Sequence, residues 1–275
     1  MVTSIKDSAT LHNGVRMPWL GFGVWQISDG ASVVDSVKNA IDAGYRSIDT
    51  AAAYRNEEGV GQAIRESGVA REELFITTKV WNADQGYEST LAAFEQSRKL
   101  LGLDYIDLYL IHWPVKGKYK ETWRALEKLY ADGLVRAIGV CNFQTHHLED
   151  LKDGATIVPM VNQVEYHPLL AQLELRDYCR ANNIQLEAWS PLMQGNLDVP
   201  VLAEIGERYG KTPAQVVLRW DLQNEVVTIP KSTTPARIQS NADIFDFVLA
   251  QEDMDRITAL NQSKRFGPDP DNFNF

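Results

Sequence analysis

The sequence predicts an α/β protein in which eight parallel strands alternate with helices and close into a barrel, and three observations support this. Short apolar runs alternate along the chain with longer stretches whose apolar residues recur at helical spacing. Eight such runs are present, and a length of 275 residues favours one closed barrel over an open doubly wound sheet. No Pro-, Gly- or Ser-rich linker divides the chain, so residues 1–275 form a single domain.

A hairpin is expected first, because Thr10-Leu11-His12 and Val15-Arg16-Met17 flank an Asn13-Gly14 turn. The first buried strand spans Leu20–Val24. The later strands are expected at Ser47–Asp49, Phe75–Lys79, Ile106–His112, Val135–Cys141, Met160–Glu165, Gln185–Ser190 and Val226–Ile229. The helices are expected at Ala31–Ala43, Asn56–Ser67, Tyr87–Leu101, Lys120–Asp132, Thr145–Lys152, Leu173–Asn182, Val201–Tyr209, Thr212–Gln223, Pro235–Ala242 and Ala250–Leu260. The prediction is therefore a (β/α)8 barrel with an N-terminal β-hairpin, two extra helices and an irregular tail.

Composition narrows the class of protein. An apolar content of 44% with 23% charged residues is typical of a soluble globular protein, and a net charge of −10 disfavours nucleic acid or an anionic membrane as the main partner. The two cysteines, Cys141 and Cys179, lack the spacing of a disulfide framework. No signal-peptide core or membrane-length apolar run is present, so a cytoplasmic location is expected.

Each of three successive predicted strands ends in an ionisable side chain, and the first also leads to a second one. The strand before Asp49 leads through a small-residue loop to Tyr54, the next ends in Lys79, and the third ends in His112. Taken alone, Asp49 could be a turn residue and Tyr54 a packed aromatic. The carboxyl ends of barrel strands converge on one face, however, so the four side chains are predicted to form one site.

These four residue types suit proton transfer to a carbonyl group. Asp49 can compensate the charge of a buried Lys79, and the ammonium of Lys79 is expected to lower the pKa of Tyr54. Tyr54 would then act as general acid, while His112 would orient a substrate carbonyl by hydrogen bonding. The alternative is an ion pair that only caps the barrel.

A general acid facing a carbonyl needs a hydride source. The sequence has no GxGxxG fingerprint after a strand and no P-loop, so a dinucleotide must be held differently. The segment Ile229–Arg237 follows the last strand and combines Lys231, hydroxyl groups and a helix start, as anion sites do. The competing interpretation is an ordinary helix cap beside two surface cations.

Over essentially its whole length the chain resembles the aldo-keto reductases. The segment Gly44–Gly61 is similar to the first signature of that family, Leu129–Phe143 contains the second, and 229–244 is similar to the third. The resemblance is strongest to a bacterial branch that includes 2,5-diketo-D-gluconate reductases and glyoxal or methylglyoxal reductases. It implies NADPH as cofactor and the catalytic tetrad Asp49, Tyr54, Lys79 and His112.

The resemblance also implies the cofactor contacts. Asn142 and Gln163 would hold the nicotinamide carboxamide, and Trp189 would stack on the nicotinamide ring. The remaining contacts would come from Ser190, Leu192, Gln194 and Gly195 at the pyrophosphate, Lys231, Ser232 and Arg237 at the adenosine 2′-phosphate, and Asn241 at the adenine. Cys141 departs from the serine that many members carry, which weakens one contact to the carboxamide.

Trp25, Trp81 and Trp113 follow strands one, three and four and are predicted to line an apolar substrate pocket, although each could instead be ordinary packing. The short loop at 114–120 and the modest tail suggest an open site. No metal is expected: His146-His147 has no acidic or cysteine partner at ligand spacing, and no HExxH or CxxC occurs.

The expected function is NADPH-dependent reduction of small aldehydes, dicarbonyls such as methylglyoxal, and keto sugars. The alternative is a subunit that binds NADPH as a redox sensor without turnover; a sugar isomerase would need a metal site. We expect a monomer.

Overall fold

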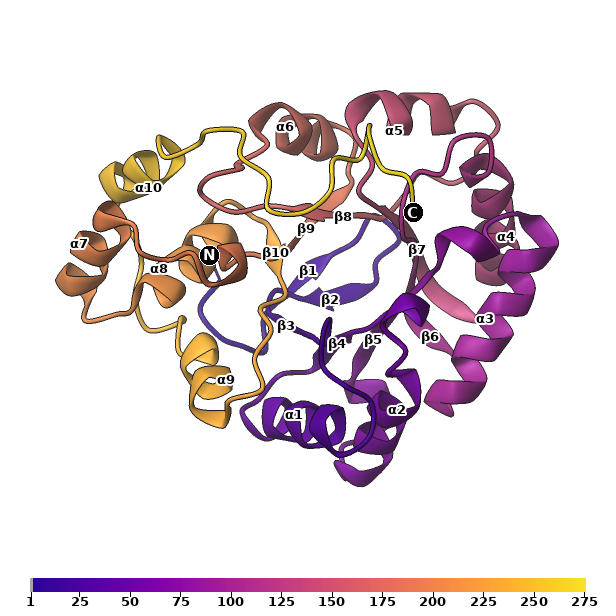
Figure 1. The fold of residues 1–275 in the computed structure, drawn as a ribbon, viewed down its shortest axis with the longest axis horizontal. Helices are drawn as coiled ribbons and strands as arrows, with labels where there is room; N and C mark the ends of the chain where they lie inside the picture. The colour runs from indigo at the N-terminus through magenta and orange to yellow at the C-terminus, as the bar shows by residue number, and fades with distance from the viewer. Residues whose placement is uncertain (1) are drawn as a thin grey trace.

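Eight parallel strands form the centre of the fold in the computed structural model, which describes residues 2–275 (Figure 1). The strands are β3(Gly21–Gly23), β4(Ser47–Asp49), β5(Phe75–Val80), β6(Ile106–Ile111), β7(Val135–Cys141), β8(Val161–Glu165), β9(Gln185–Trp189) and β10(Val227–Thr228). Each strand pairs with its neighbour in chain order. A parallel bridge between Leu20 and Thr228 joins the first strand to the last, so the sheet closes into the predicted barrel.

Helices surround the strands, as Figure 1 shows. They are α1(Ala31–Asp42), α2(Glu57–Glu66), α3(Tyr87–Leu101), α4(Tyr119–Ala131), α5(Thr145–Lys152), α6(Leu173–Ala181), α7(Pro200–Tyr209), α8(Pro213–Gln223), α9(Pro235–Ala242) and α10(Gln251–Thr258). Helix α8 begins with a capping box in which Thr212 and Gln215 satisfy each other's backbone N–H groups. Within residues 2–275, no helix is both long and apolar enough to cross a membrane.

The N-terminal hairpin, β1(Ser8–Thr10) and β2(Arg16–Pro18), lies against the end of the barrel where the strands begin. Asn13 Nδ2 donates to the carbonyl of Arg136 at the start of β7, and His12 Nε2 contacts the carbonyl of Val158 just before β8. The hairpin therefore leaves the opposite end, where the strands finish, open for a site.

The observed elements differ from the predicted ones mainly at their ends. Helix and strand boundaries move by one or two residues, and the last strand is shortened to Val227–Thr228. Pro230 explains part of this shortening because it has no backbone N–H with which to continue the ladder. The tail 266–275 is irregular, as expected.

The barrel interior changes in character along the barrel axis. Strands β5 and β6 are buried along their whole length, and apolar side chains fill most of the interior. Near the strand ends, several polar side chains are almost completely buried instead, among them Asp49, Lys79, Gln163 and Glu187. Such groups are tolerated in a protein interior only when they bind one another, which directs attention to this end of the barrel.

Candidate active site

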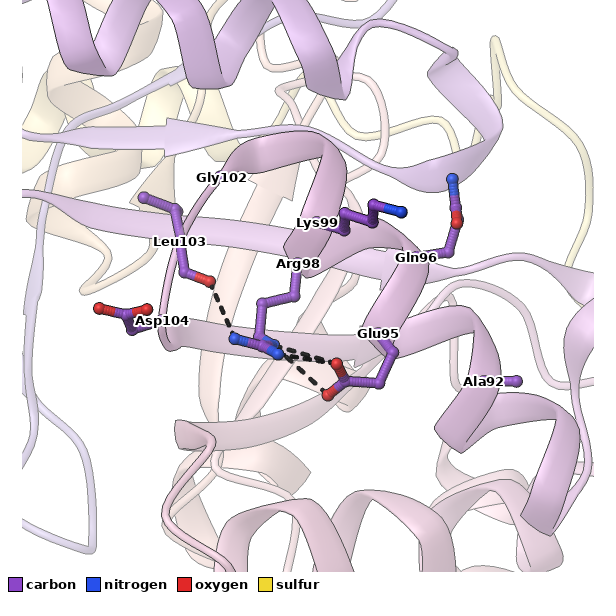
Figure 2. A pocket seen from close by; sticks show the side chains of 8 residues that line it. All are labelled: Ala92, Glu95, Gln96, Arg98, Lys99, Gly102, Leu103 and Asp104. Atoms are coloured by element: carbon purple, nitrogen blue, oxygen red, sulfur yellow. Dashed lines mark hydrogen bonds and ion pairs between the residues drawn. The ribbon is translucent and has the colours of Figure 1, made fainter.

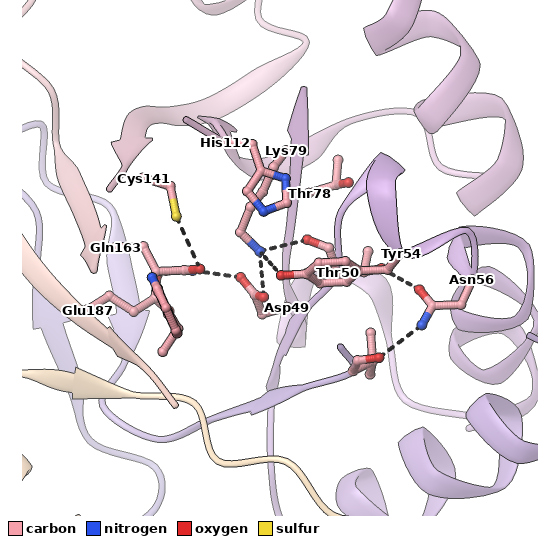
Figure 3. A network of polar contacts seen from close by, with 12 residues as sticks. Asp49, Thr50, Tyr54, Asn56, Thr78, Lys79, His112, Cys141, Gln163 and Glu187 are labelled. Atoms are coloured by element: carbon pink, nitrogen blue, oxygen red, sulfur yellow. Dashed lines mark hydrogen bonds and ion pairs between the residues drawn. The ribbon is translucent and has the colours of Figure 1, made fainter. Parts of the chain in front are cut away.

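Lys79 is the centre of the polar network at the strand ends (Figure 3). Its side chain is fully buried, and Nζ donates to Asp49 Oδ1 at 2.7 Å and to the Thr50 carbonyl at 3.0 Å. Burial is the largest single effect and disfavours the ammonium, but the surrounding groups, with Asp49 first among them, together outweigh it and raise the pKa of Lys79 above its usual value. Lys79 is therefore charged at neutral pH.

Tyr54 contacts the ammonium group of Lys79. It ends the short 3₁₀ turn Ala52–Tyr54, which Arg55 closes in the left-handed conformation with φ 55°. The hydroxyl of Tyr54 is 3.3 Å from Lys79 Nζ, which donates to it, and the ammonium also lies 5.0 Å from the centre of the phenol ring. The small residues of this loop thus allow the Tyr54 hydroxyl to approach Lys79 Nζ.

The predicted lowering of the Tyr54 pKa is wrong in its net direction. Shielding from water is the largest effect and raises the pKa of Tyr54, while the ammonium of Lys79 lowers it by a smaller amount. The hydroxyl therefore keeps its proton throughout the neutral pH range. A protonated phenol is the form that a general acid requires.

His112 follows β6 and faces Tyr54. The two rings lie edge to face with centres 5.7 Å apart, and the side chain of His112 is 7% exposed. Burial, together with the charge of Lys79, lowers the pKa of His112 well below its usual value, so the imidazole is neutral at pH 7. A neutral imidazole can donate one hydrogen bond to a substrate oxygen without adding a second positive charge to the site.

Glu187 belongs to the same network and was not identified from the sequence. Gln163 Nε2 lies 2.8 Å from Asp49 Oδ2 and 2.8 Å from Glu187 Oε2, so its amide bridges the two carboxyl groups. Burial, with a further contribution from Asp49, raises the pKa of Glu187 to about 8. The sequence did contain a signal for Glu187, because it is an acidic residue inside a short and mostly apolar strand. A buried carboxyl group in such a strand needs hydrogen-bond partners.

Asn142 and Trp189 form a second polar pair at the same end of the barrel. Asn142 adopts the left-handed conformation with φ 65°, and its Nδ2 donates to the His112 carbonyl at 3.0 Å. Its Oδ1 accepts a hydrogen bond from Trp189 Nε1 at 2.9 Å. This bond orients the half-buried indole of Trp189 above the strand ends.

The loop after β9, where the pyrophosphate contacts are predicted, is tightly turned. Ser190, Met193, Gln194 and Gly195 all have positive φ, and the loop is closed by bonds from Met193 N to the Ser190 carbonyl and from Gly195 N to the Leu192 carbonyl. Leu192 is half-buried, whereas Gln194 and Gly195 are exposed. The positive φ values and these internal bonds give the loop a tight, fixed path beside the end of β9.

The predicted phosphate site lies between β10 and α9. Lys231 and Arg237 are exposed, and no carboxylate among residues 2–275 forms an ion pair with either. Ser232 is 9% exposed and accepts a hydrogen bond from Thr234 N at 3.1 Å, which shapes the turn into α9; Asn241, on α9, is 6% exposed. Two free cations beside a helix start suit the 2′-phosphate of NADPH, so these residues fit the cofactor.

Aromatic side chains cover the approach to His112. Trp81 lies with its ring 5.2 Å from that of His112 and stacks on Phe275 at 5.9 Å with an angle of 4° between the planes. The buried Trp113 contacts the rings of Phe273 and Phe275 at 5.1 and 5.2 Å. Trp25 is 45% exposed, so its place in the pocket stays a prediction.

The C-terminal segment contributes to this wall, which the sequence did not indicate. Figure 1 shows the segment running in yellow from α10 across the barrel toward α5. Glu165 holds its start by accepting from Phe266 N at 2.7 Å and Gly267 N at 3.1 Å, and Asn82 Nδ2 donates to the Phe275 carbonyl at 3.1 Å. The tail therefore forms part of the wall beside Trp81 and Trp113.

His146-His147 has no acidic partner at ligand spacing along the chain, but the fold brings the distant Asp271 to it. Asp271 Oδ1 lies 2.8 Å from His146 Nε2 and 3.5 Å from His147 Nε2. However, His147 Nδ1 accepts a hydrogen bond from Gln144 N at 3.0 Å, so a neutral His147 carries its proton on Nε2, the atom that would have to bind a metal. The contact is better explained as an anchor for the tail.

A hollow on the outer surface of α3 is unrelated to this site (Figure 2). Its lining includes Glu95 and Arg98, which form an exposed ion pair at 2.8 Å, and Arg98 also donates to the Leu103 carbonyl at 3.4 Å. These contacts satisfy one another, and none of the residues predicted to act in catalysis lies there.

The barrel and its strand-end network of a buried lysine, a phenol and an imidazole define a protein equipped for proton donation beside a dinucleotide. The profile of the Aldo/keto reductase family matches residues 19–262, and the chain belongs to this family. The predicted fold and family are confirmed.

Similar proteins share this architecture over their full length. Glyoxal reductase of Bacillus subtilis is 67% identical over 100% of both chains, and methylglyoxal reductase DkgA of Escherichia coli is 50% identical over 96% of each. Among solved structures, the D53A mutant of Gox0644 in complex with NADPH has a TM-score of 0.93, with 44% identity and 98% coverage of both chains.

Proposed function

We propose that this protein is an NADPH-dependent reductase of small aldehydes and dicarbonyls such as glyoxal and methylglyoxal. One observation carries the proposal: a protonated Tyr54 lies within hydrogen-bond distance of the buried, charged Lys79, with neutral His112 facing its ring. The similarity to glyoxal reductase and methylglyoxal reductase supports the substrate class, and the structure of a relative with NADPH supports the cofactor.

NADPH, when bound, supplies a hydride to the carbonyl carbon. The residues of the chain manage the oxygen and the proton. His112 and Tyr54 hydrogen-bond to the carbonyl oxygen, and the proton of Tyr54 passes to it as negative charge develops there. Lys79 stabilises the phenolate that remains, and Asp49 keeps the ammonium of Lys79 in place. A proton from water then restores the phenol.

The residues predicted to hold the cofactor form three groups around this centre. Gln163, Asn142 and Trp189 would hold the nicotinamide, and the loop at 190–195 would lie over the pyrophosphate. Lys231, Ser232 and Arg237 would bind the 2′-phosphate, and Asn241 the adenine. The aromatic wall of Trp81, Trp113 and the tail lies beside His112 and suits the apolar part of a small carbonyl compound.

The first experiment titrates the protein with NADPH by tryptophan fluorescence and then follows nicotinamide absorbance after addition of glyoxal, methylglyoxal or a diketo sugar acid. We expect saturable quenching followed by absorbance decay, with dicarbonyls reduced fastest. Quenching without decay on any carbonyl would instead support a sensor that binds NADPH, and no quenching would refute the cofactor assignment.

Replacing Tyr54 with Phe tests the mechanism. The general acid is lost while the ring and its packing are kept, so kcat should fall about a hundred- to ten-thousandfold. The dissociation constant for NADPH should change little, since the hydroxyl is not expected to contact the cofactor. Turnover close to that of the unmodified enzyme would contradict the mechanism.

A further inference from the structure

Glu187 is the one member of the strand-end network to which the proposed mechanism gives no role. It lies in β9, is 1% exposed, and its Oε2 accepts from Gln163 Nε2 at 2.8 Å. Its second oxygen, Oε1, has no hydrogen-bond partner among residues 2–275. A buried carboxyl group is costly for the fold, which indicates that its single contact has a purpose.

The contact uses up the donors of Gln163. A side-chain amide has two N–H bonds on Nε2, and here one points to Asp49 Oδ2 and the other to Glu187 Oε2, both at 2.8 Å (Figure 3). The amide oxygen Oε1 is left without a strong donor, because its contact is the Cys141 thiol at 3.7 Å. Gln163 therefore has an acceptor available and no donor.

The two carboxyl groups have different effects on the amide. Asp49 alone fixes the direction of one N–H bond but lets the planar group rotate about that bond. A second acceptor, placed on the other N–H, fixes the plane. Two acceptors on one amide thus determine where Oε1 points, and this geometry depends on Glu187.

We propose that Glu187 is a positioning residue that fixes the amide plane of Gln163, so that Oε1 accepts a hydrogen bond from the carboxamide N–H of the nicotinamide. The inference rests on the proposed function, because the role of Gln163 toward the nicotinamide belongs to it. The positioning role does not need a second negative charge beside Asp49. A neutral carboxyl group still accepts through its carbonyl oxygen, in agreement with the raised pKa of Glu187.

The test compares two binding constants, so that it does not depend on turnover. Tryptophan fluorescence measures the dissociation constants of NADP⁺ and of its 3-acetylpyridine analogue, in which a methyl group replaces the carboxamide NH2. The unmodified protein should bind the analogue about tenfold more weakly, because Gln163 Oε1 then loses its donor.

Two variants of similar size separate positioning from packing. Glu187→Met removes the acceptor and should reduce the preference for NADP⁺ from about tenfold to about twofold, mainly by weakening NADP⁺ binding. Glu187→Gln keeps an acceptor oxygen at the same reach and should preserve the preference. A packing role would affect both cofactors equally. Should the Met variant fail to fold, Glu187→Ala offers the same comparison without added bulk.

Each outcome tests a different part of the proposal. An unchanged preference in Glu187→Met would overturn the positioning role, as would an equal loss of preference in Glu187→Gln. If the unmodified protein binds NADP⁺ and the analogue equally well, Gln163 does not act as the acceptor and the inference fails while the reductase stands. If it binds neither, the proposed function itself fails.

Discussion

Lys79 is the residue on which both the stability of the site and its proton transfer depend. Its ammonium is fully buried and donates to Asp49, the Thr50 carbonyl and Tyr54. A buried ion is tolerated only when such partners compensate its lost hydration. The same contacts that stabilise the charge also place it against the phenol, so stability and proton transfer depend on one geometry.

Removing the charge of Lys79 is therefore expected to affect both properties. In Lys79→Met the carboxylate of Asp49 stays buried without its cation, which should destabilise the fold by about 3–5 kcal/mol. Turnover should fall at least about a hundredfold, since the phenolate loses its stabilising charge. Urea unfolding and initial rates measure the two effects.

The double variant Asp49→Asn/Lys79→Met supplies the control. With both charges removed, much of the lost stability should return while turnover stays low. Unfolding of the single variant at the same urea concentration as the unmodified protein would show that the pair is not compensated in the way the structure indicates.

At the scale of elements, the segments that follow the strands determine what the barrel can bind. The turn after β10 presents Lys231, the first turn of α9 presents Arg237, and the loop after β9 contains a run of residues with positive φ. The tail holds the aromatic wall through Glu165 and Asn82. None of these segments is needed to close the barrel, so they are free to serve binding.

Replacing Arg237 with Ala tests the phosphate clamp. The guanidinium would interact with the 2′-phosphate of NADPH, which NADH lacks. The dissociation constant for NADPH should rise about ten- to a hundredfold, and that for NADH should stay nearly constant. Fluorescence titration with both cofactors measures the effect, and Arg16→Ala, an exposed arginine on the hairpin, serves as control. Equal effects on the two cofactors would refute the clamp.

Gly267, in the tail, packs closely against the ring of Trp189. A Cβ atom added at Gly267 would overlap Trp189 Cη2 and lie 3.3 Å from Glu165 Oε2. We therefore expect Gly267→Ala to displace the indole, lowering stability by about 1–3 kcal/mol and weakening NADPH binding. Thermal unfolding and fluorescence titration provide the measurements, with Pro268→Ala, at the exposed neighbouring residue, as control. Unchanged binding would mean that the Trp189 ring does not contact the cofactor.

At the scale of the whole molecule, the feature that matters for assembly is the closure of the barrel. The Leu20–Thr228 bridge closes the sheet, and helices cover its outer face. The large apolar side chains exposed within residues 2–275 are dispersed along the chain; they are Trp25, Val158, Leu173, Val248 and Phe275. Within residues 2–275, the closed eight-stranded sheet leaves no edge strand to pair with a second copy.

We accordingly expect the protein to be a monomer of 30.9 kDa in solution. Sedimentation equilibrium at several concentrations, with and without NADPH, checks this expectation. Both conditions should give the monomer mass, because the closed sheet has no edge strand that needs a partner. A mass twice as large at micromolar concentration would contradict it.

The sequence by itself determined the fold class and the location of the site. Alternating apolar runs and helical periodicity predict a parallel sheet covered by helices, and the position of Asp49, Lys79 and His112 relative to the strand ends places them on one face. These properties are local, since each follows from residues close together in the chain.

Only the tertiary structure decided the contacts between distant segments. The bridge from Gln163 to Glu187 and Asp49, the packing of Phe275 on Trp81 and the approach of Asp271 to His146 join residues far apart in sequence. The net direction of the Tyr54 pKa also depended on the tertiary structure, since burial outweighs the neighbouring ammonium. Desolvation and long-range packing arise when the whole barrel encloses a group, which no short stretch of sequence records.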